Sequence, residues 1–174
     1  MTHLPAFAID DEGNQDPDDA LSLEGNRLWV HVADVAALAP PDSDVDLEAR
    51  ARGANLYLPE RTITMLPPEA THQLGLGLSE VSPALSFGLD LSDDGRLQDV
   101  EVTPSWVRVT RMTYEEVSQR LDEVPFKGMY QLAQLSEERR MEEEAISIDL
   151  PEVKIAVHEG EVSIEPMQPL PSRM

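Results

Sequence analysis

The chain has 174 residues, of which 41% are hydrophobic and 5% aromatic, so it is long enough to bury one mainly aliphatic core. Its 34 acidic and 13 basic residues give a formal net charge of -21 at pH 7, a balance that repels polyanions such as RNA. The sequence has no cysteine, which excludes a disulfide scaffold, and it shows neither a signal peptide nor an apolar stretch of membrane-spanning length. We therefore expect a cytoplasmic protein.

Strand patterns and two short helices are predicted in the first half of the chain. In order, they are adjacent strands over 6–9 and 28–35 with a turn at 24–26, a helix over 47–55 after an acid-rich start at 42–46, and a helix from 67–68 toward 74. Residues 84–91 and 97–109 then predict a hairpin around Asp93-Asp94-Gly95, which is a good turn sequence.

The second half adds helices and a last hairpin. Thr113-Tyr114-Glu115-Glu116 is a capping box that predicts a helix to residue 122. A longer helix is predicted over 128–144, a hairpin over 153–164 that turns at Glu159-Gly160, and a proline-rich linker over 166–174. These elements indicate an α+β fold, mainly antiparallel β-sheet with several short helices and one longer helix. One domain would cover residues 1–166, followed by a tail over 167–174.

The densest chemical signal is an acidic loop. Six of the ten residues from Asp10 to Asp19 are Asp or Glu, far above the background of about one in five. Carboxylates this close raise one another's pKa values and oppose folding unless a cation or basic ligand compensates them. Mg²⁺ and Mn²⁺ are hard cations that prefer oxygen ligands, so they suit such a loop. A solvated acidic turn is the alternative.

Spacing excludes a calcium-binding EF-hand at this loop. An EF-hand needs oxygen ligands at positions 1, 3 and 5, glycine at 6 and glutamate at 12. Counted from Asp10, position 6 is Gln15 and position 12 is Leu21. Counted from Asp11, position 3 is Gly13, which has no side-chain ligand.

The loop resembles the active-site signature of the RNB catalytic domain, found in the RNase II and RNase R family of exoribonucleases. That signature is a strand ending in Ile-Asp, a turn, and then Asp-x-Asp-Asp-Ala, which matches Asp10, Asp16, Asp18 and Asp19 here. Further segments agree in order and approximate spacing: Val30-His31-Val32-Ala33-Asp34-Val35, Tyr57-Leu58-Pro59, Met65-Leu66-Pro67 and Thr113-Tyr114. The resemblance extends from Phe7 to about Pro166.

The resemblance implies an RNB-like fold and processive hydrolysis of single-stranded RNA from the 3′ end, with Mg²⁺, or Mn²⁺ in its place, releasing nucleoside 5′-monophosphates. It makes Asp10 and Asp19 direct metal ligands and Asp16 a ligand or its support. Asp18 would lie nearest the chemistry, on a second metal or on the attacking water. The catalytic candidates are thus Asp16 and Asp18, and all four aspartates are metal candidates.

Aromatic and basic residues are weighed in the same way. Tyr114 matches a family tyrosine that clamps RNA bases near the 3′ end, whereas a structural tyrosine is the alternative. Tyr57 is a substrate-binding candidate that could instead only shape a channel wall. Other side chains have open alternatives: Arg50, Arg52 and Arg61 contact phosphates or pair with local acids, Trp29 and Trp106 lie in the core, and His31 is structural.

The chain also departs from the family. Family members carry RNA-binding OB-fold modules on both sides of the catalytic domain, and its later half supplies a basic residue and a second stacking aromatic. Residues 73–85 lack the usual Cys-Ser-Leu and arginine. We therefore expect an amino-terminal part of a catalytic domain with little activity alone, belonging to a protein that is monomeric at full length. Two alternatives remain: a catalytically silent RNB-like binding module, and an acidic nucleic-acid mimic that binds a basic protein.

Overall fold

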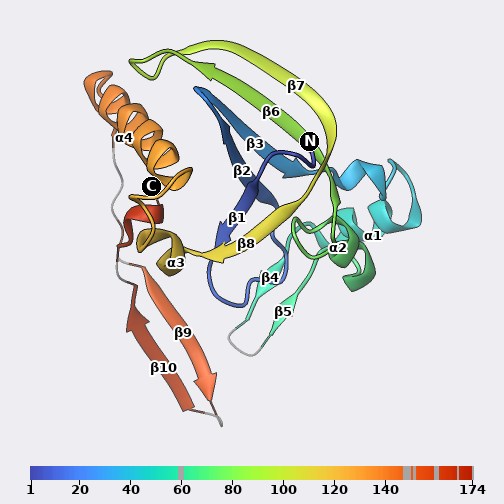
Figure 1. The fold of residues 1–174 in the computed structure, drawn as a ribbon. Helices are drawn as coiled ribbons and strands as arrows, with labels where there is room; N and C mark the ends of the chain where they lie inside the picture. The colour runs from blue at the N-terminus through green and yellow to red at the C-terminus, as the bar shows by residue number, and fades with distance from the viewer. Residues whose placement is uncertain (59–60, 147–149, 151, 159–160, 168, 174) are drawn as a thin grey trace.

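The fold is built on one six-stranded sheet. The computed structural model describes residues 1–58, 61–146, 150, 152–158, 161–167 and 169–173. The strands of the sheet are β1 (Ala6–Asp10), β2 (Asp19–Glu24), β3 (Arg27–Ala33), β6 (Ser82–Leu91), β7 (Leu97–Val107) and β8 (Val109–Thr113). They lie in the order β7-β6-β3-β2-β1-β8, and each neighbouring pair is antiparallel except β1 with β8 (Figure 1). The predicted fold class is confirmed.

Strand β2 is missing from the sequence-based prediction, which makes β1 and β3 neighbours. In the structure β2 lies between them, with Leu21 paired to Phe7 of β1 and to Val30 of β3. The prediction is wrong because β2 directly follows the acidic loop, and its buried residues Ala20 and Ser22 carry too little hydrophobicity to mark a strand. The turn predicted between β1 and β3 therefore joins β2 to β3.

The two faces of the sheet carry side chains of different size. Alanines and serines are buried on one face: Ala6, Ala8, Ala20, Ser22, Ala84 and Ser86. The other face carries larger side chains, such as Leu21 and Leu23, on which Phe126 and Met129 of the long helix α4 (Phe126–Glu142) pack. Burial of this aliphatic and aromatic cluster holds α4 on the sheet.

Gly88 leaves the space that the buried indole of Trp29 occupies. The two residues are paired directly between β6 and β3, and a Cβ at position 88 would lie 2.7 Å from the Trp29 ring. We predict that Gly88→Ala lowers the free energy of unfolding by about 1–3 kcal/mol, the usual cost of overpacking a core. Urea unfolding followed by circular dichroism measures this loss. The loss should shrink in a Trp29→Leu background, and an equal loss in both backgrounds would show that the ring is not the cause.

The remaining helices are short. They are α1 (Asp44–Arg52), α2 (Pro68–Leu74) and α3 (Tyr114–Ser118), with 3-10 turns η1 (Val35–Ala37) and η2 (Pro171–Arg173). Helix α1 begins earlier than predicted because the Ser43 hydroxyl caps it, accepting a hydrogen bond from the Asp46 N–H at 3.3 Å. The predicted capping box at Thr113 is present, although α3 ends at Ser118 and not near residue 122.

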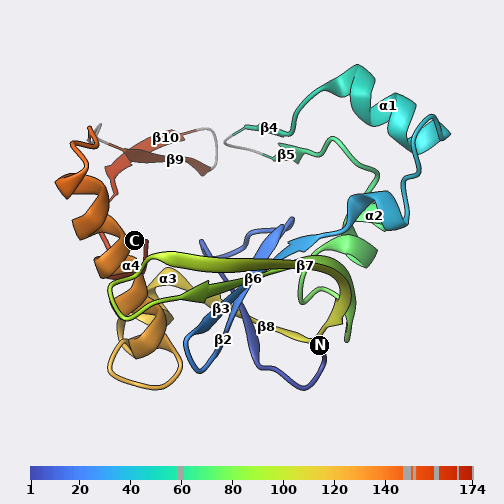
Figure 2. The ribbon, with the colours of Figure 1, turned by 90° about the horizontal axis from the view of Figure 1, so that it is seen from above.

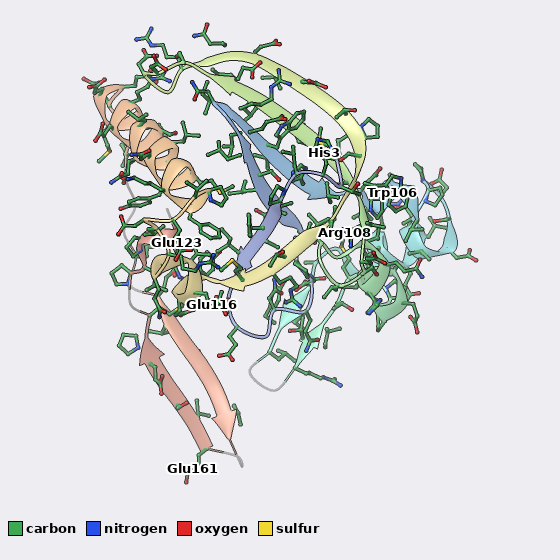
Figure 3. All side chains as sticks on the ribbon, viewed as in Figure 1. His3, Trp106, Arg108, Glu116, Glu123 and Glu161 are labelled. Atoms are coloured by element: carbon green, nitrogen blue, oxygen red, sulfur yellow. The ribbon has the colours of Figure 1, made fainter. Side chains whose placement is uncertain are left out.

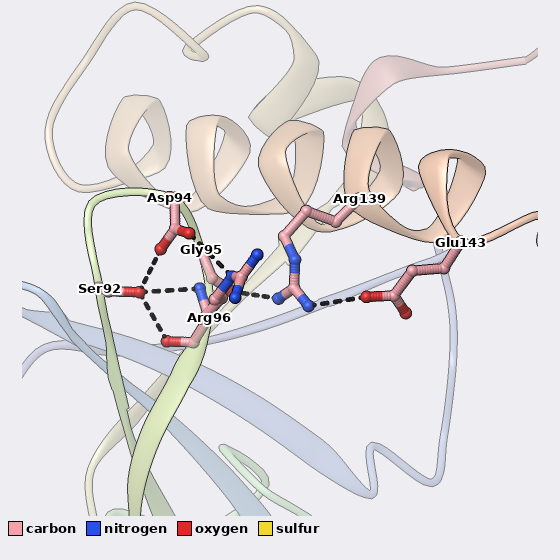
Figure 4. Close-up of polar contacts among 6 residues, drawn as sticks. All are labelled: Ser92, Asp94, Gly95, Arg96, Arg139 and Glu143. Carbon is pink, nitrogen blue, oxygen red and sulfur yellow. Dashed lines mark hydrogen bonds and ion pairs between the residues drawn. The ribbon is translucent and has the colours of Figure 1, made fainter.

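The turn of the long β6–β7 hairpin is held against α4. The Arg139 guanidinium donates a hydrogen bond to the Gly95 carbonyl at 3.1 Å and forms an ion pair with Glu143 at 3.1 Å (Figure 4). The Ser92 hydroxyl closes the turn by accepting the Arg96 N–H at 3.1 Å. These contacts fix the far end of the hairpin relative to the helix.

Two small hairpins extend from the sheet on the side of the acidic loop (Figures 1 and 2). They are formed by β4 (Leu56–Tyr57) with β5 (Thr62–Ile63) and by β9 (Val153–His158) with β10 (Glu161–Pro166). The turn predicted at Glu159-Gly160 lies outside the described residues.

The tail differs from the predicted linker, because its last described residues fold back onto α3. The Ser172 hydroxyl donates to the Tyr114 carbonyl at 2.6 Å and lies 2.8 Å from the Ser118 hydroxyl. Proline content suggested a linker, but two hydroxyl contacts give the segment a docking point. None of the described helices has the length and apolarity needed to cross a membrane.

Candidate metal and RNA site

The sheet topology brings the acidic loop and the start of α3 together. Asp10 ends β1 and Asp19 begins β2, so the loop that holds Asp16 and Asp18 connects two antiparallel neighbours. Strand β8 runs parallel to β1, and its last residue is level with Asp10. Because the two strands end at the same edge of the sheet, Tyr114 at the start of α3 lies beside the loop. Five of the six predicted site residues thus come from adjoining elements.

Hydrogen bonds within the loop fix Asp10. The Asn14 side-chain amide donates to one carboxylate oxygen of Asp10, and the Asp11 N–H donates to the other at 2.8 Å. Gly13 has a φ angle of 83°, a left-handed conformation that glycine adopts without strain. The local sequence therefore both turns the chain and orients the first carboxylate.

Asp16 is held by the segment that follows α1. The Asn55 amide donates to Asp16 at 2.5 Å, and the Tyr57 hydroxyl donates to the same oxygen at 3.1 Å. The Asn55 carbonyl oxygen in turn accepts the Met65 N–H at 2.6 Å. Asn55 is a site residue that the sequence analysis missed, because a single asparagine after a helix carries no recognisable pattern.

The backbone between Asp16 and Asp19 is anchored to the core. Pro17 is fully buried, and its carbonyl accepts the Leu76 N–H at 2.9 Å. The Asp18 carbonyl accepts the Ala33 N–H at 2.8 Å. Both anchors leave the Asp18 side chain free to face the loop interior together with its neighbours.

Asp18 and Asp19 carry charge that the protein does not neutralise. Partial burial raises the pKa of both carboxyls, the charges of Asp16, Asp19 and Asp10 raise that of Asp18 further, and the charge of Asp10 does the same for Asp19. A raised folded-state pKa means that these acids destabilise the fold above their ordinary pKa and that stability is regained as the pH falls. Within the described residues, none of the four aspartates forms an ion pair with a basic side chain.

The acidic start of α1 shows the opposite arrangement. Arg50 forms ion pairs with Asp42 and Asp46, both at 2.6 Å, and Arg52 forms one with Glu48 at 2.5 Å. For these two arginines the structure thus shows the alternative of pairing with local acids. Of the two acid-rich segments, only the 10–19 loop is left with its aspartates uncompensated by arginine.

The donor set of the loop fits a hard divalent cation. It offers only carboxylate oxygens, the ligand type of Mg²⁺ and Mn²⁺, and their mutual repulsion is the imbalance that a cation removes. Across the part of the chain that the structure describes, no three His, Asp or Glu side chains already stand close enough to enclose an ion. A bound ion would therefore compete with Asn14 and Asn55 for the oxygens of Asp10 and Asp16.

The two candidate tyrosines flank the loop in different ways. Tyr57 is 66% exposed, and its ring lines the same cavity as the four aspartates, with a volume of about 460 Å³. Tyr114 is partly buried, and the Arg173 guanidinium lies 4.3 Å from its ring centroid while also contacting Asp11. Burial and the charge of Asp10 raise the pKa of Tyr114. Arg173 is a second residue that the sequence analysis missed, because the tail was expected to be a linker.

Comparison with known proteins decides the family. A family model described as the RNB domain matches residues 1–173. The chain belongs to the RNB domain family. An uncharacterized ribonuclease of Synechocystis sp. is 41% identical over 174 residues, and chloroplastic/mitochondrial ribonuclease II of Arabidopsis thaliana is 36% identical over 169 residues.

Solved structures share the RNB fold. Mycoplasma genitalium RNase R, solved with ribose-methylated single-stranded RNA, superposes with a TM-score of 0.89 at 21% identity, covering 99% of this chain and 30% of that one. Yeast Ssd1, described as a pseudonuclease, gives a TM-score of 0.72 at 24% identity over 82% of this chain and 19% of its own. The chain spans 26% and 21% of the Synechocystis and Arabidopsis relatives.

Three other aromatic side chains of this RNB chain have structural places. Trp29 is buried, as predicted, but the prediction for Trp106 is wrong, since it is 59% exposed on the edge strand β7 (Figure 3). An apolar strand pattern does not distinguish an edge strand from a central one. His31 is buried with its ring nitrogens 3.0 Å from the Ser22 hydroxyl and 2.7 Å from the Ser86 hydroxyl, and burial lowers its pKa to about 4. Arg61 is exposed.

Proposed function

We propose that the chain forms the metal-binding part of an exoribonuclease that degrades single-stranded RNA processively from the 3′ end. The products would be nucleoside 5′-monophosphates, with Mg²⁺ or Mn²⁺ as the cofactor. One observation carries the proposal: four aspartates converge without a basic partner in the described structure of an RNB chain. The ribonuclease names of its relatives support the same reaction class.

Each of the four carboxylates has an assigned role. Asp10 and Asp19, at the facing ends of two neighbouring strands, would hold the ion, with Asp16 as a further ligand or as a support. The ion, when bound, lowers the pKa of water and neutralises charge that develops on the phosphate. Asp18 has the charge environment to orient the attacking water and to hold its proton.

Substrate binding would use the two tyrosines and a basic surface that the described chain lacks. Tyr57 exposes its ring beside the aspartates, and base stacking on an aromatic contributes about 1–3 kcal/mol. Nucleic-acid affinity depends mainly on positive charge, and the net charge here is -21. We therefore expect these 174 residues alone to bind RNA weakly and to cleave it slowly. A cytoplasmic location and a monomeric full-length enzyme belong to the same proposal.

A catalytically silent binding module is the second candidate. The observation that favours it is the structural likeness to yeast Ssd1, which is described as a pseudonuclease. The two candidates share a fold and differ in whether the aspartates carry out hydrolysis.

An activity assay on the intact gene product distinguishes them. With 5′-labelled single-stranded RNA and Mg²⁺, we expect shortening from the 3′ end, and Asp18→Asn should slow it by at least about a hundredfold. Asp122→Asn, an exposed aspartate after α3, is the matched control and should retain the full rate. Absence of cleavage by the unmodified protein, or full activity of Asp18→Asn, would contradict the exoribonuclease proposal.

A further inference from the structure

The β9–β10 hairpin has one wholly apolar face. Its register pairs Val162 with Val157, Ile164 with Ile155 and Pro166 with Val153, and paired residues of antiparallel strands lie on the same side. Alternation along each strand then places all six side chains on one face. A hydrogen bond from the Met167 N–H to the Glu152 carbonyl at 2.9 Å extends the pairing beyond the last rung.

This face is exposed. The exposed fractions are 48% for Val153, 47% for Ile155, 64% for Val162 and 63% for Ile164. The hairpin extends away from the sheet, with Glu161 at its outer end (Figure 3). A two-stranded hairpin is at best marginally stable alone in water, and an apolar face on one side needs a cover to contribute to stability.

Charge narrows the choice of cover. A second copy of the chain would bring another -21 charges, and RNA and anionic membranes are repelled for the same reason. Glu152, Glu161 and Glu165 are exposed along the same hairpin. A protein surface with an apolar centre and basic residues around it fits both the face and its surroundings.

We propose that the apolar face of the β9–β10 hairpin docks a basic polypeptide surface. The docking does not depend on the nuclease proposal, because it involves none of the four aspartates or the two tyrosines. If that proposal also holds, the docked surface would bring positive charge to the side of the molecule that carries the acidic loop, where RNA must approach (Figure 2).

Two synthetic helical peptides of about 18 residues test the docking. Both carry the same stripe of leucines, with lysines on the polar face of one and glutamates on that of the other. Fluorescence anisotropy should show the lysine peptide binding to the chain at least about tenfold more tightly than the glutamate peptide. The double variant Val162→Ser, Ile164→Ser should weaken the lysine peptide at least about tenfold, because it removes the apolar centre of the surface.

The control variant is Leu97→Ser, Val102→Ser, whose parent side chains on β7 are exposed to 54% and 52%. It should bind like the unmodified chain, and circular dichroism should show all variants folded. Equal binding of the lysine peptide to both double variants would mean attraction by charge alone and would overturn the proposal. Preferential binding of the glutamate peptide would also overturn it, as would self-association in sedimentation velocity that the hairpin variant abolishes.

Discussion

The double variant Asp10→Asn, Asp19→Asn should lose Mg²⁺ binding and yet unfold at a higher temperature than the unmodified chain without metal. Binding is lost because the two carboxylates at the facing ends of β1 and β2 are the proposed ligands, and loss of ligands should weaken affinity by at least about tenfold. Stability rises because the substitutions remove charge that raises the pKa of Asp18 and costs folding free energy at neutral pH. Calorimetric titration and thermal unfolding at pH 7 measure the two effects.

The matched control replaces two exposed aspartates outside the loop, Asp93 and Asp122, by asparagine. It has the same change in net charge, so it separates the loop from the general acidity of the chain. We expect its Mg²⁺ affinity to be unchanged. If the loop variant binds Mg²⁺ like the control, or unfolds at a lower temperature than the unmodified chain, the loop is not an uncompensated metal site.

Phe126→Ala should lower the free energy of unfolding by about 3–5 kcal/mol, the range found when large buried side chains are truncated. Phe126 is 2% exposed, and its ring meets that of Phe7 edge-on at 4.9 Å between centroids. It packs with Val117 and Met129, so its removal leaves a cavity where α3, α4 and β1 meet. Urea unfolding followed by far-UV circular dichroism measures the loss.

Lys127→Ala, one position further along α4, is the control because this side chain is exposed. Its effect should stay within about 0.5 kcal/mol, as expected for a surface substitution away from caps and cores. Equal effects of the two substitutions would show that α4 is not held on the sheet by the Phe126 cluster.

Much of the fold could be predicted from hydrophobic pattern and turn chemistry. The β6–β7 hairpin, the capping box at Thr113 and the long helix all have strong local signals, and all three are present. Strand β2 has none, since its buried face is alanine and serine and its burial depends on tertiary packing. The exposure of Trp106 also depends on strand order, which the local pattern does not contain.

The candidate site was predictable where it consists of consecutive residues. The acidic loop and Tyr114 were found from density and family spacing, and the parallel pairing of β1 with β8 brings them together. Asn55 and Arg173 were not found, because each reaches the site through a contact between segments distant in sequence. Such second contacts orient the carboxylates and the ring, and only the fold reveals them.

Binding of Mn²⁺ followed by nuclear magnetic resonance tests the central claim most directly, because the ion broadens signals only from nuclei near it. We predict saturable broadening centred on residues 10–19 and on the start of α3, which the double variant Asp10→Asn, Asp19→Asn abolishes. The acids of α1 should be unaffected, since Arg50 and Arg52 already neutralise them. Broadening centred on α1, or spread over the acidic surface and unchanged in the variant, would contradict a metal site at the acidic loop.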